Sequence, residues 1–298
     1  MTEISNSFRS AHRVAPIAKG NKPVGLLLVV TPVLLVFWLI IYPIISAVIS
    51  TIFIGDPDGN VGISFASYRF FFSDGYSLAN LWLTLWTTIV CGALLLLIGL
   101  PIALYLRFSH GRLAGYVQAL AIFPMFVPSV ILAYALIRTI GPNGAVDLVL
   151  NALGLPKLPS PYLTPWGPVI GLVWDNLPLT VLMLTAGLSS ISNSSVEAAR
   201  DVGASPLRVF VSIILPRMGN SMLVTGSFAI LGIFSAFTLP YMLGRASPET
   251  MGPFMQRTFS DLNDPRAALT QAVISFGFCL LFGLFYVRSI AKNRETRR

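Results

Sequence analysis

The residues from Glu197 to Gly203, Glu-Ala-Ala-Arg-Asp-Val-Gly, form a polar stretch between two strongly apolar runs. Their hydrogen-bonding groups match a capping box, because Glu197 follows Ser194 by three residues and both side chains can satisfy backbone N–H groups at a helix start. This predicts a short helix from Ser195 to about Val202. Gly203 then stands where the helix end requires left-handed dihedrals.

A second helix is predicted directly after this turn. Ser205 can cap it, and Pro206 occupies the first helical position, where a missing N–H costs little. The segment then leads to Pro216. The local sequence therefore predicts a helix, a sharp turn and a second helix, which together form a compact knob at the membrane face.

The fixed positions of this segment resemble the EAA loop of ABC importer permeases. Glu-Ala-Ala begins at Glu197, Gly203 follows after three residues, and Ile213-Ile-Leu-Pro216 follows after nine more. The resemblance extends from the first apolar run to the end of the chain. It implies the type I ABC importer transmembrane fold and a loop, about 192–217, that couples the permease to an ATPase.

The same resemblance implies roles for individual residues. Glu197 would accept a charge-assisted hydrogen bond from the ATPase, Ala198 and Ala199 would keep the contact face small, and Gly203 would set the angle between the helices. Arg200 and Asp201 would contact the ATPase or form a solvated helix face. Glu197 is expected to serve both its own capping box and this contact.

The implied assembly has several further members. They are two ATP-binding cassette subunits, a second homologous permease that is expected to be distinct, an extracytoplasmic solute-binding protein and the lipid membrane. ATP and Mg²⁺ would be bound by the ATPase, so this chain would carry no cofactor. The net charge of +8 does not indicate nucleic-acid binding, because the basic residues flank apolar runs and form no single patch.

Composition indicates an all-α integral membrane protein. Of 298 residues 55% are hydrophobic and only 11% are charged, which is rare in soluble domains. Runs near the roughly 20 residues needed to cross a bilayer can satisfy their backbone only as helices. Six spans are expected, at Val24–Ile54, Leu81–Leu106, Gly115–Ile140, Pro168–Ile191, Met218–Leu243 and Leu269–Ile290.

Lys and Arg placement predicts the orientation. Fourteen of the 20 basic residues lie on the side of the N-terminus, which predicts that both termini and the Glu197 loop lie in the cytoplasm. The resemblance implies that the membrane is a bacterial inner membrane. The predicted organisation is a cytoplasmic tail at 1–22, the transmembrane domain at 23–291 and a basic tail at 292–298. The first run is too long for a signal peptide, which favours a retained anchor.

Catalytic motifs are missing from the sequence. There is no phosphate-binding Gly-x-x-x-x-Gly-Lys-Ser/Thr run, no His-Glu-x-x-His, no Cys-x-x-Cys and no Gly-x-Ser-x-Gly. His12 and His110 are expected to be ordinary surface residues. The chain is therefore expected to be a transport subunit with no metal site, with ATP hydrolysis on a separate chain.

Asp175 and Asn176 are candidates for a substrate pathway. They lie about two turns into the fourth predicted span, where an ionisable residue faces a cavity or a neighbouring helix and not lipid. The competing interpretation is a buried structural pair with Arg138.

The cargo is less well defined by the sequence. The segments 168–174, 197–205 and 263–268 resemble the spermidine/putrescine permease branch, although Asp264 and Ala267 depart from its Asn-Trp-Pro-x-Gly-Ala-Ala pattern. The resemblance implies a small polar solute such as a polyamine or a similar organic ion, and permeases for iron, phosphonates and opines share much of the same pattern. The alternatives are a secondary transporter or channel that is not driven by ATP and, less well supported, a membrane enzyme or scaffold.

Overall fold

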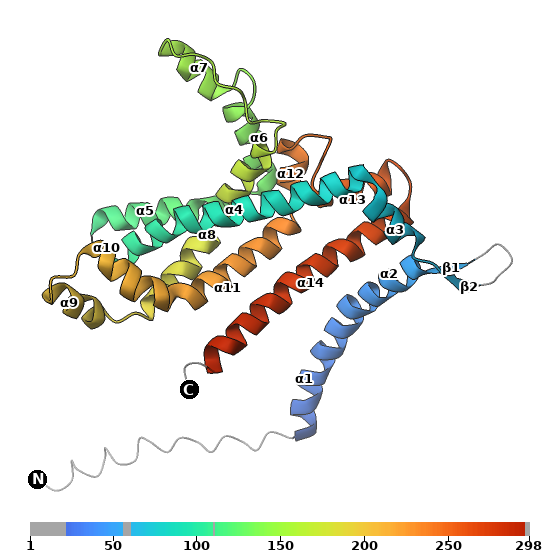
Figure 1. Ribbon diagram of the computed structural model, residues 1–298, viewed down its shortest axis with the longest axis horizontal. Helices are drawn as coiled ribbons and strands as arrows, with labels where there is room; N and C mark the ends of the chain where they lie inside the picture. Colours follow the sequence, from blue (N-terminus) through green and yellow to red (C-terminus); the bar gives the residue numbers. More distant parts are fainter. Residues whose placement is uncertain (1–21, 56–60, 110, 296–298) are drawn as a thin grey trace, which may run out of the picture. The chain divides into compact units, whose positions relative to one another are not determined.

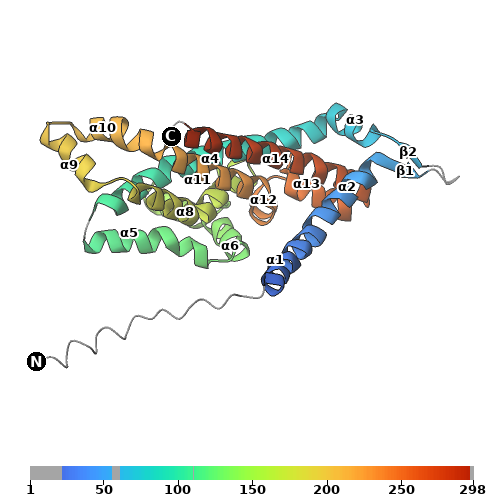
Figure 2. The ribbon, with the colours of Figure 1, turned by 90° about the horizontal axis from the view of Figure 1, so that it is seen from below.

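The computed structural model describes residues 22–55, 61–109 and 111–295, and these residues form mainly helices (Figures 1 and 2). The chain divides into two units, Met1–Ser50 and Thr51–Arg298. His12, His110, nearly all of the predicted tail 1–22 and the last three residues of the tail 292–298 lie outside the described residues. The first four residues of the predicted basic tail continue the last helix, α14.

The first apolar run is helical as far as Ile52, and its predicted last residue, Ile54, lies in the strand β1 that follows. Its elements are α1 (Lys22–Val36), the π-helix η1 (Phe37–Ile41) and α2 (Tyr42–Ile52). Large apolar side chains are exposed on all sides of η1 and of the described parts of α1. A helix that is apolar all round suits a lipid environment.

A short hairpin and two helices follow in the second unit. Asp74 begins α4 as its N-cap, because its carboxylate accepts the Ser77 backbone N–H at 2.8 Å. The elements are β1 (Phe53–Gly55) and β2 (Val61–Ile63), which pair antiparallel, then α3 (Ala66–Ser73) and α4 (Gly75–Phe108). α4 packs closely on α8 (Trp166–Ser189), where a Cβ added at Gly99 would lie 2.9 Å from the Thr180 methyl carbon.

The prediction of one continuous third span from Gly115 to Ile140 is wrong. Pro124 lies in a 3₁₀ helix and Pro128 is the N-cap of the next helix, so the run is broken between them. The elements are α5 (Arg112–Ile122), η2 (Phe123–Phe126), α6 (Ser129–Ile140) and α7 (Ala145–Ala152).

The fifth predicted span also ends earlier than Leu243. The helix stops at Phe234, and a short separate helix contains Pro240. The remaining elements are α9 (Asn193–Asp201), α10 (Pro206–Val209), the π-helix η3 (Phe210–Ile214), α11 (Leu215–Phe234), α12 (Thr238–Leu243), α13 (Met251–Ser260) and α14 (Pro265–Glu295).

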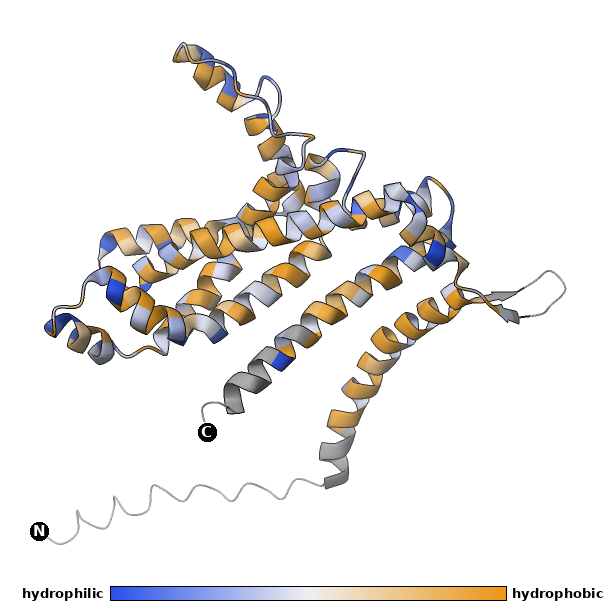
Figure 3. Ribbon diagram, in the orientation of Figure 1, coloured by the Kyte–Doolittle hydropathy of each residue, from blue (hydrophilic) through white to orange (hydrophobic). Residues whose placement is uncertain are grey.

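Six segments of the described chain are long and apolar enough to cross a membrane, as expected for an all-α integral membrane protein. Figure 3 shows that these segments consist mainly of hydrophobic residues, with hydrophilic residues gathered on α9 and on loops. The segments are Leu28–Ile52, Gly75–Phe108, Ser129–Ala152, Trp166–Ser189, Pro206–Phe234 and Pro265–Arg288.

Candidate functional site

The predicted turn at Gly203 is confirmed and forms a bent segment, here named the elbow, from Asn193 to Ile214. Its first arm, α9, ends in a Schellman motif: the Gly203 N–H donates to the Arg200 carbonyl at 2.9 Å, and the Ala204 N–H donates to the Ala199 carbonyl at 3.0 Å. Gly203 adopts φ +81°, which glycine accepts without strain.

The second arm begins as the sequence predicts. Ser205 is the N-cap of α10 and accepts the Arg208 N–H at 3.4 Å, with Pro206 at the first helical position. α10 then passes through η3 directly into α11. The second arm of the elbow is therefore the start of a membrane-spanning segment, and a displacement of the turn acts on that helix.

The predicted capping box of Ser194 and Glu197 is wrong. The helix begins two residues earlier than expected, with Ser192 as the N-cap, and the Ser192 hydroxyl lies 2.8 Å from the Ser195 hydroxyl. Glu197 therefore lies in the second turn of α9, beyond the reach of the N-cap backbone. Its side chain is exposed, so no internal capping role restrains it.

α9 presents two different faces. Val196 is only 4% exposed and packs in an apolar cluster, and Ala199 packs partly buried against the same cluster. Glu197, Ala198, Arg200 and Asp201 form the exposed face. Of the small residues singled out by the sequence, Ala198 is thus available to a partner, whereas Ala199 mainly contacts its own chain.

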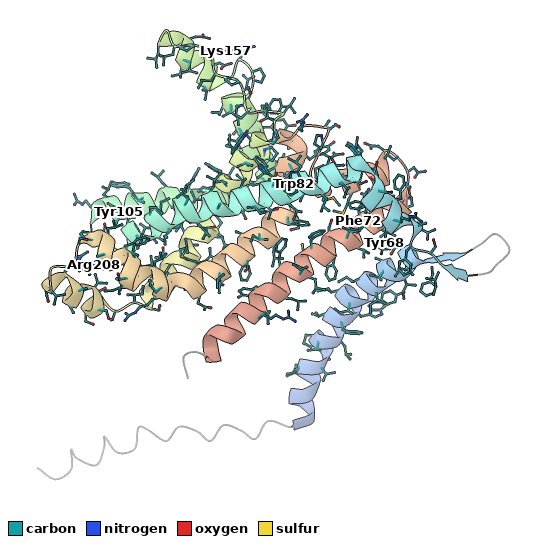
Figure 4. The ribbon with its side chains drawn as sticks, in the orientation of Figure 1. Tyr68, Phe72, Trp82, Tyr105, Lys157 and Arg208 are labelled. Carbon is teal, nitrogen blue, oxygen red and sulfur yellow. The ribbon has the colours of Figure 1, made fainter. Side chains whose placement is uncertain are left out.

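This apolar cluster ties the elbow to three long helices. It joins both arms of the elbow to α4, α8 and α11, and its buried members are Ala103, Leu184, Leu188, Ile191, Val196, Val209, Ile214 and Met218. Close-packed side chains of this kind transmit displacement between the elements that they join. Figures 1 and 2 show α9 and α10 at the end of α4 opposite to α3, and Figure 4 labels Tyr105 of α4 and Arg208 of α10 at this end of the molecule.

Two arginines, which the sequence analysis did not single out as site residues, hold the first turn of α9. Arg107, from the end of α4, donates to the Ile191 carbonyl at 3.2 Å and to the Asn193 side-chain oxygen at 2.8 Å. Arg217, from α11, donates to the Ser195 hydroxyl at 3.2 Å. The only signal for these two arginines in the sequence is that they belong to the basic residues clustered at helix ends. The positive-inside rule explains that clustering equally well.

The elbow also exposes apolar side chains next to its charges. Val202 is 84% exposed and Leu207 is 72% exposed, on either side of the Gly203 turn. Apolar groups beside charged ones are typical of a protein-binding surface. The elbow therefore combines a charged helix face with apolar contacts at its tip.

Asp175 and Asn176 lie elsewhere, in the middle of α8. Asp175 is half-buried and accepts a hydrogen bond from the Ser129 hydroxyl at 3.4 Å, and the ion pairs among the described residues do not include it. The alternative pairing with Arg138 is therefore not formed. Asn176 donates to the Leu172 carbonyl of its own helix at 2.8 Å.

The structure does not bring these two residues to the elbow. At a rise of 1.5 Å per residue, Asp175 lies roughly 20 Å along the helix axis from the end of α8 that precedes α9. They thus form a separate candidate site. In the part of the chain that the structure describes, no group of three or more His, Cys, Asp or Glu residues could hold a metal ion.

The family model described as "Binding-protein-dependent transport system inner membrane component" matches residues 95–297. The chain is 27% identical over 217 residues to the molybdenum transport system permease protein ModB of Azotobacter vinelandii, covering 72% of this chain and 95% of that protein.

Two further comparisons extend the similarity. The chain is 26% identical over 221 residues to the spermidine/putrescine transport system permease protein PotB of Escherichia coli, covering 74% of this chain and 79% of PotB. It also resembles a chain in the crystal structure of a bacterial ABC transporter that imports the polysaccharide alginate, with a TM-score of 0.71 at 19% identity, covering 90% and 95% of the two chains. This likeness shows the fold.

Proposed function

The chain belongs to the family of binding-protein-dependent transport system inner membrane components, and from that premise we propose that the elbow is where a cytoplasmic ATPase drives it. As a member of this family it is the permease subunit of an ABC importer, a transport subunit and not an enzyme.

One observation carries the coupling proposal: the elbow exposes a charged face on a helix whose other face is locked to the transmembrane helices. Glu197 and Ala198 face solvent, whereas Val196 packs in the cluster shared with α4, α8 and α11. A partner that grips the exposed face would therefore move these helices as well.

The proposed mechanism follows from this connection. Closure of two ATPase subunits would draw together the elbows of two permeases and switch the cavity between inward-facing and outward-facing states. Glu197, Ala198, Arg200 and Asp201 would supply the contact, and Gly203 and Ala199 would hold the bend. ATP and Mg²⁺ would be bound by the ATPase and not by this chain.

The remaining partners and the orientation belong to the same proposal. A solute-binding protein would deliver cargo on the outer side, and a second, distinct permease would complete the pathway. Both termini and the elbow would lie on the cytoplasmic side, which the distribution of basic residues supports.

For the cargo we propose a small polar organic cation of the polyamine class. Relatives with about the same identity carry the names of different cargoes, molybdenum and spermidine/putrescine, so identity alone does not distinguish them. Asp175 supports the cation, because a half-buried carboxylate whose described contact is a neutral hydroxyl can attract positive charge.

Reconstitution tests both parts of this proposal. The chain would be co-expressed with its neighbouring ATPase, permease and binding protein and placed in liposomes. Uptake of labelled spermidine should require ATP and the loaded binding protein. Uptake of molybdate and not spermidine would contradict the proposed cationic cargo. Uptake without ATP would contradict the proposal that an ATPase drives transport.

A charge reversal tests the elbow itself. Glu197→Lys should remove the ATPase from the purified complex, because it replaces a negatively charged hydrogen-bond acceptor by a positively charged donor. That donor would repel the donor proposed on the ATPase. Ser194→Lys is the matched control, since Ser194 is also exposed on α9 but lies outside the Glu-Ala-Ala segment. Equal ATPase retention by wild type and Glu197→Lys would contradict the docking role.

A further inference from the structure

A cavity of about 590 Å³ lies at the other end of α4 from the elbow, between α3, the first turn of α4, α13 and the first turns of α14. Its walls are mainly aromatic and apolar, with Phe70, Phe71 and Phe254 among them. Charged and polar side chains also reach it from all four of these helices. A cavity of this size takes a small ligand or the polar end of a larger one.

Two arginines in this cavity retain unused hydrogen-bond donors. Arg266 donates through Nη2 to the Thr51 carbonyl, and Arg257 pairs with Glu249 at 2.6 Å and stacks over Tyr76. The Nε atom of each is buried without a partner among the described residues. Buried guanidinium donors without partners favour an anionic group such as a phosphate.

The same cavity contains acceptors for a cation. Gln271 is 4% exposed, and it donates to the Thr258 hydroxyl at 3.0 Å, which leaves its Oε1 buried without a partner among the described residues. The carboxylates of Asp74 and Asp264 lie along the same cavity. Each carboxylate already accepts a helix-capping hydrogen bond and has further acceptor capacity. An ammonium group with N–H donors can therefore donate to the Gln271 oxygen and to both carboxylates, whereas a quaternary ammonium could not.

The position of the cavity indicates where such a ligand would come from. Asp74 and Asp264 immediately precede α4 and α14, which are both membrane-spanning helices, so the cavity lies where these helices leave the bilayer. α3 exposes Phe70 and Phe72 beside it, and Figure 4 shows Phe72 and Tyr68 on this helix. Exposed aromatic side chains at helix ends are typical of the membrane–water interface.

We propose that this cavity binds the headgroup of an aminophospholipid of the phosphatidylethanolamine type. The phosphate lies against Arg266 and Arg257, the ammonium group lies against Gln271 and the two aspartates, and the first acyl carbons contact the phenylalanines. The lipid fixes α3 and α13 to the starts of α4 and α14. This site is separate from both the elbow and the Asp175 site.

Lipid titration of the full chain, in the complex in which it purifies, tests this site. The delipidated complex is titrated with phosphatidylethanolamine, phosphatidylcholine and phosphatidylglycerol, and the bound lipid is counted by native mass spectrometry. Phosphatidylethanolamine should bind about tenfold more tightly than the other two, since each of those lacks the primary ammonium donor. Equal binding of all three overturns the proposal.

Three variants assign the binding to this cavity. Each variant should weaken phosphatidylethanolamine binding about tenfold. Arg266→Gln removes a donor to the phosphate, Gln271→Leu removes an acceptor for the ammonium group, and Ala267→Phe fills the space that the ligand needs. Arg245→Gln is the control, because Arg245 is an exposed arginine of a neighbouring cavity and does not line this one. If Arg266→Gln does not fold, the other two variants decide; wild-type affinity in both overturns the site.

A soluble headgroup separates a lipid from a free solute. Glycerophosphoethanolamine carries the same phosphate and ammonium groups without acyl chains, and it should compete only at far higher concentration than the lipid. Competition at the same concentration as the lipid would make the site one for a soluble zwitterion and would overturn the lipid assignment.

Discussion

The Arg107 guanidinium donates a 2.8 Å hydrogen bond to the Asn193 side-chain oxygen, which joins the last turn of α4 to the first residue of α9. The same Nη2 atom donates to the Ile191 carbonyl, so one side chain holds both the elbow and the chain leading to it. The exposed face of α9 is thereby connected to a transmembrane helix through a polar contact as well as through the apolar cluster.

Replacing Arg107 by alanine should uncouple transport from ATP hydrolysis. The substitution removes charge-assisted hydrogen bonds worth about 1.5–3 kcal/mol when shielded, with less expected here because the side chain is partly exposed. The elbow is then held to α4 by the apolar cluster alone, so part of its displacement is lost, and the number of solutes imported per ATP hydrolysed should fall several-fold. Uptake and ATPase activity measured in the same liposomes give this ratio.

Arg112→Ala is the matched control for this variant. Arg112 is the exposed first residue of α5, in the same predicted cytoplasmic loop, and its loss removes the same charge. If Arg112→Ala lowers the ratio as much as Arg107→Ala does, net charge and not the contact with Asn193 explains the effect.

Gly203 gives a second prediction, based on backbone conformation alone. A Cβ added there would meet no atom within 4 Å, so a substitution is strained only through its φ of +81°. Left-handed dihedrals cost an L-residue about 1–2 kcal/mol, and asparagine tolerates them best. Gly203→Val should therefore lower the transport-to-hydrolysis ratio, whereas Gly203→Asn should stay close to wild type. Equal loss in both variants would indicate that the partner needs a bare backbone at this turn.

The sequence predicted the elbow well where the signal is local. Gly203 and Ser205–Pro206 impose their conformations on the chain wherever it folds, and both appear as expected. The helix start was misplaced because several serines precede Glu197, and any of them can cap. Ser192 is the N-cap instead, and the residue after it, Asn193, is held by Arg107. These two residues are 86 positions apart in the sequence, so no local pattern predicts their contact.

The spans show the same contrast between local and tertiary signals. Hydropathy located the apolar runs, because the cost of lipid exposure is additive along the chain. It did not locate the breaks at η2 and after Phe234, where apolar residues continue but the helix stops. The ion pair between the buried Glu249 and the partly exposed Arg257 was also missed, since the polar composition of residues 245–268 is typical of a solvated loop.

Glu249 gives a prediction on pH. Burial raises the pKa of this carboxyl above its ordinary value near 4.5, and the Arg257 guanidinium offsets only part of that rise. The folded chain therefore binds more protons than the unfolded chain above about pH 4.5, and stability falls as pH rises through the interval between the two pKa values. Glutamine has no proton to lose, so the thermal midpoint of Glu249→Gln relative to wild type should rise from pH 4 to pH 7.

The opposite slope would show that Arg257 dominates the site. If the ion pair outweighs burial, the folded pKa lies below the ordinary value, and wild type gains stability over Glu249→Gln as pH rises. Measuring both chains in one detergent at constant ionic strength keeps screening equal.

Asp175 gives a last prediction, which separates a pathway role from a structural one. Its carboxylate accepts a single 3.4 Å hydrogen bond from Ser129 among the described contacts, so little of its charge is used within the chain. If it attracts a cationic cargo, Asp175→Asn should lower spermidine uptake about tenfold, because an ionic hydrogen bond to the cargo is lost. Complex yield and thermal midpoint should stay unchanged. If Asp175 is structural, Ser129→Ala breaks the same contact, and both variants should lower the thermal midpoint together while uptake per folded complex is preserved.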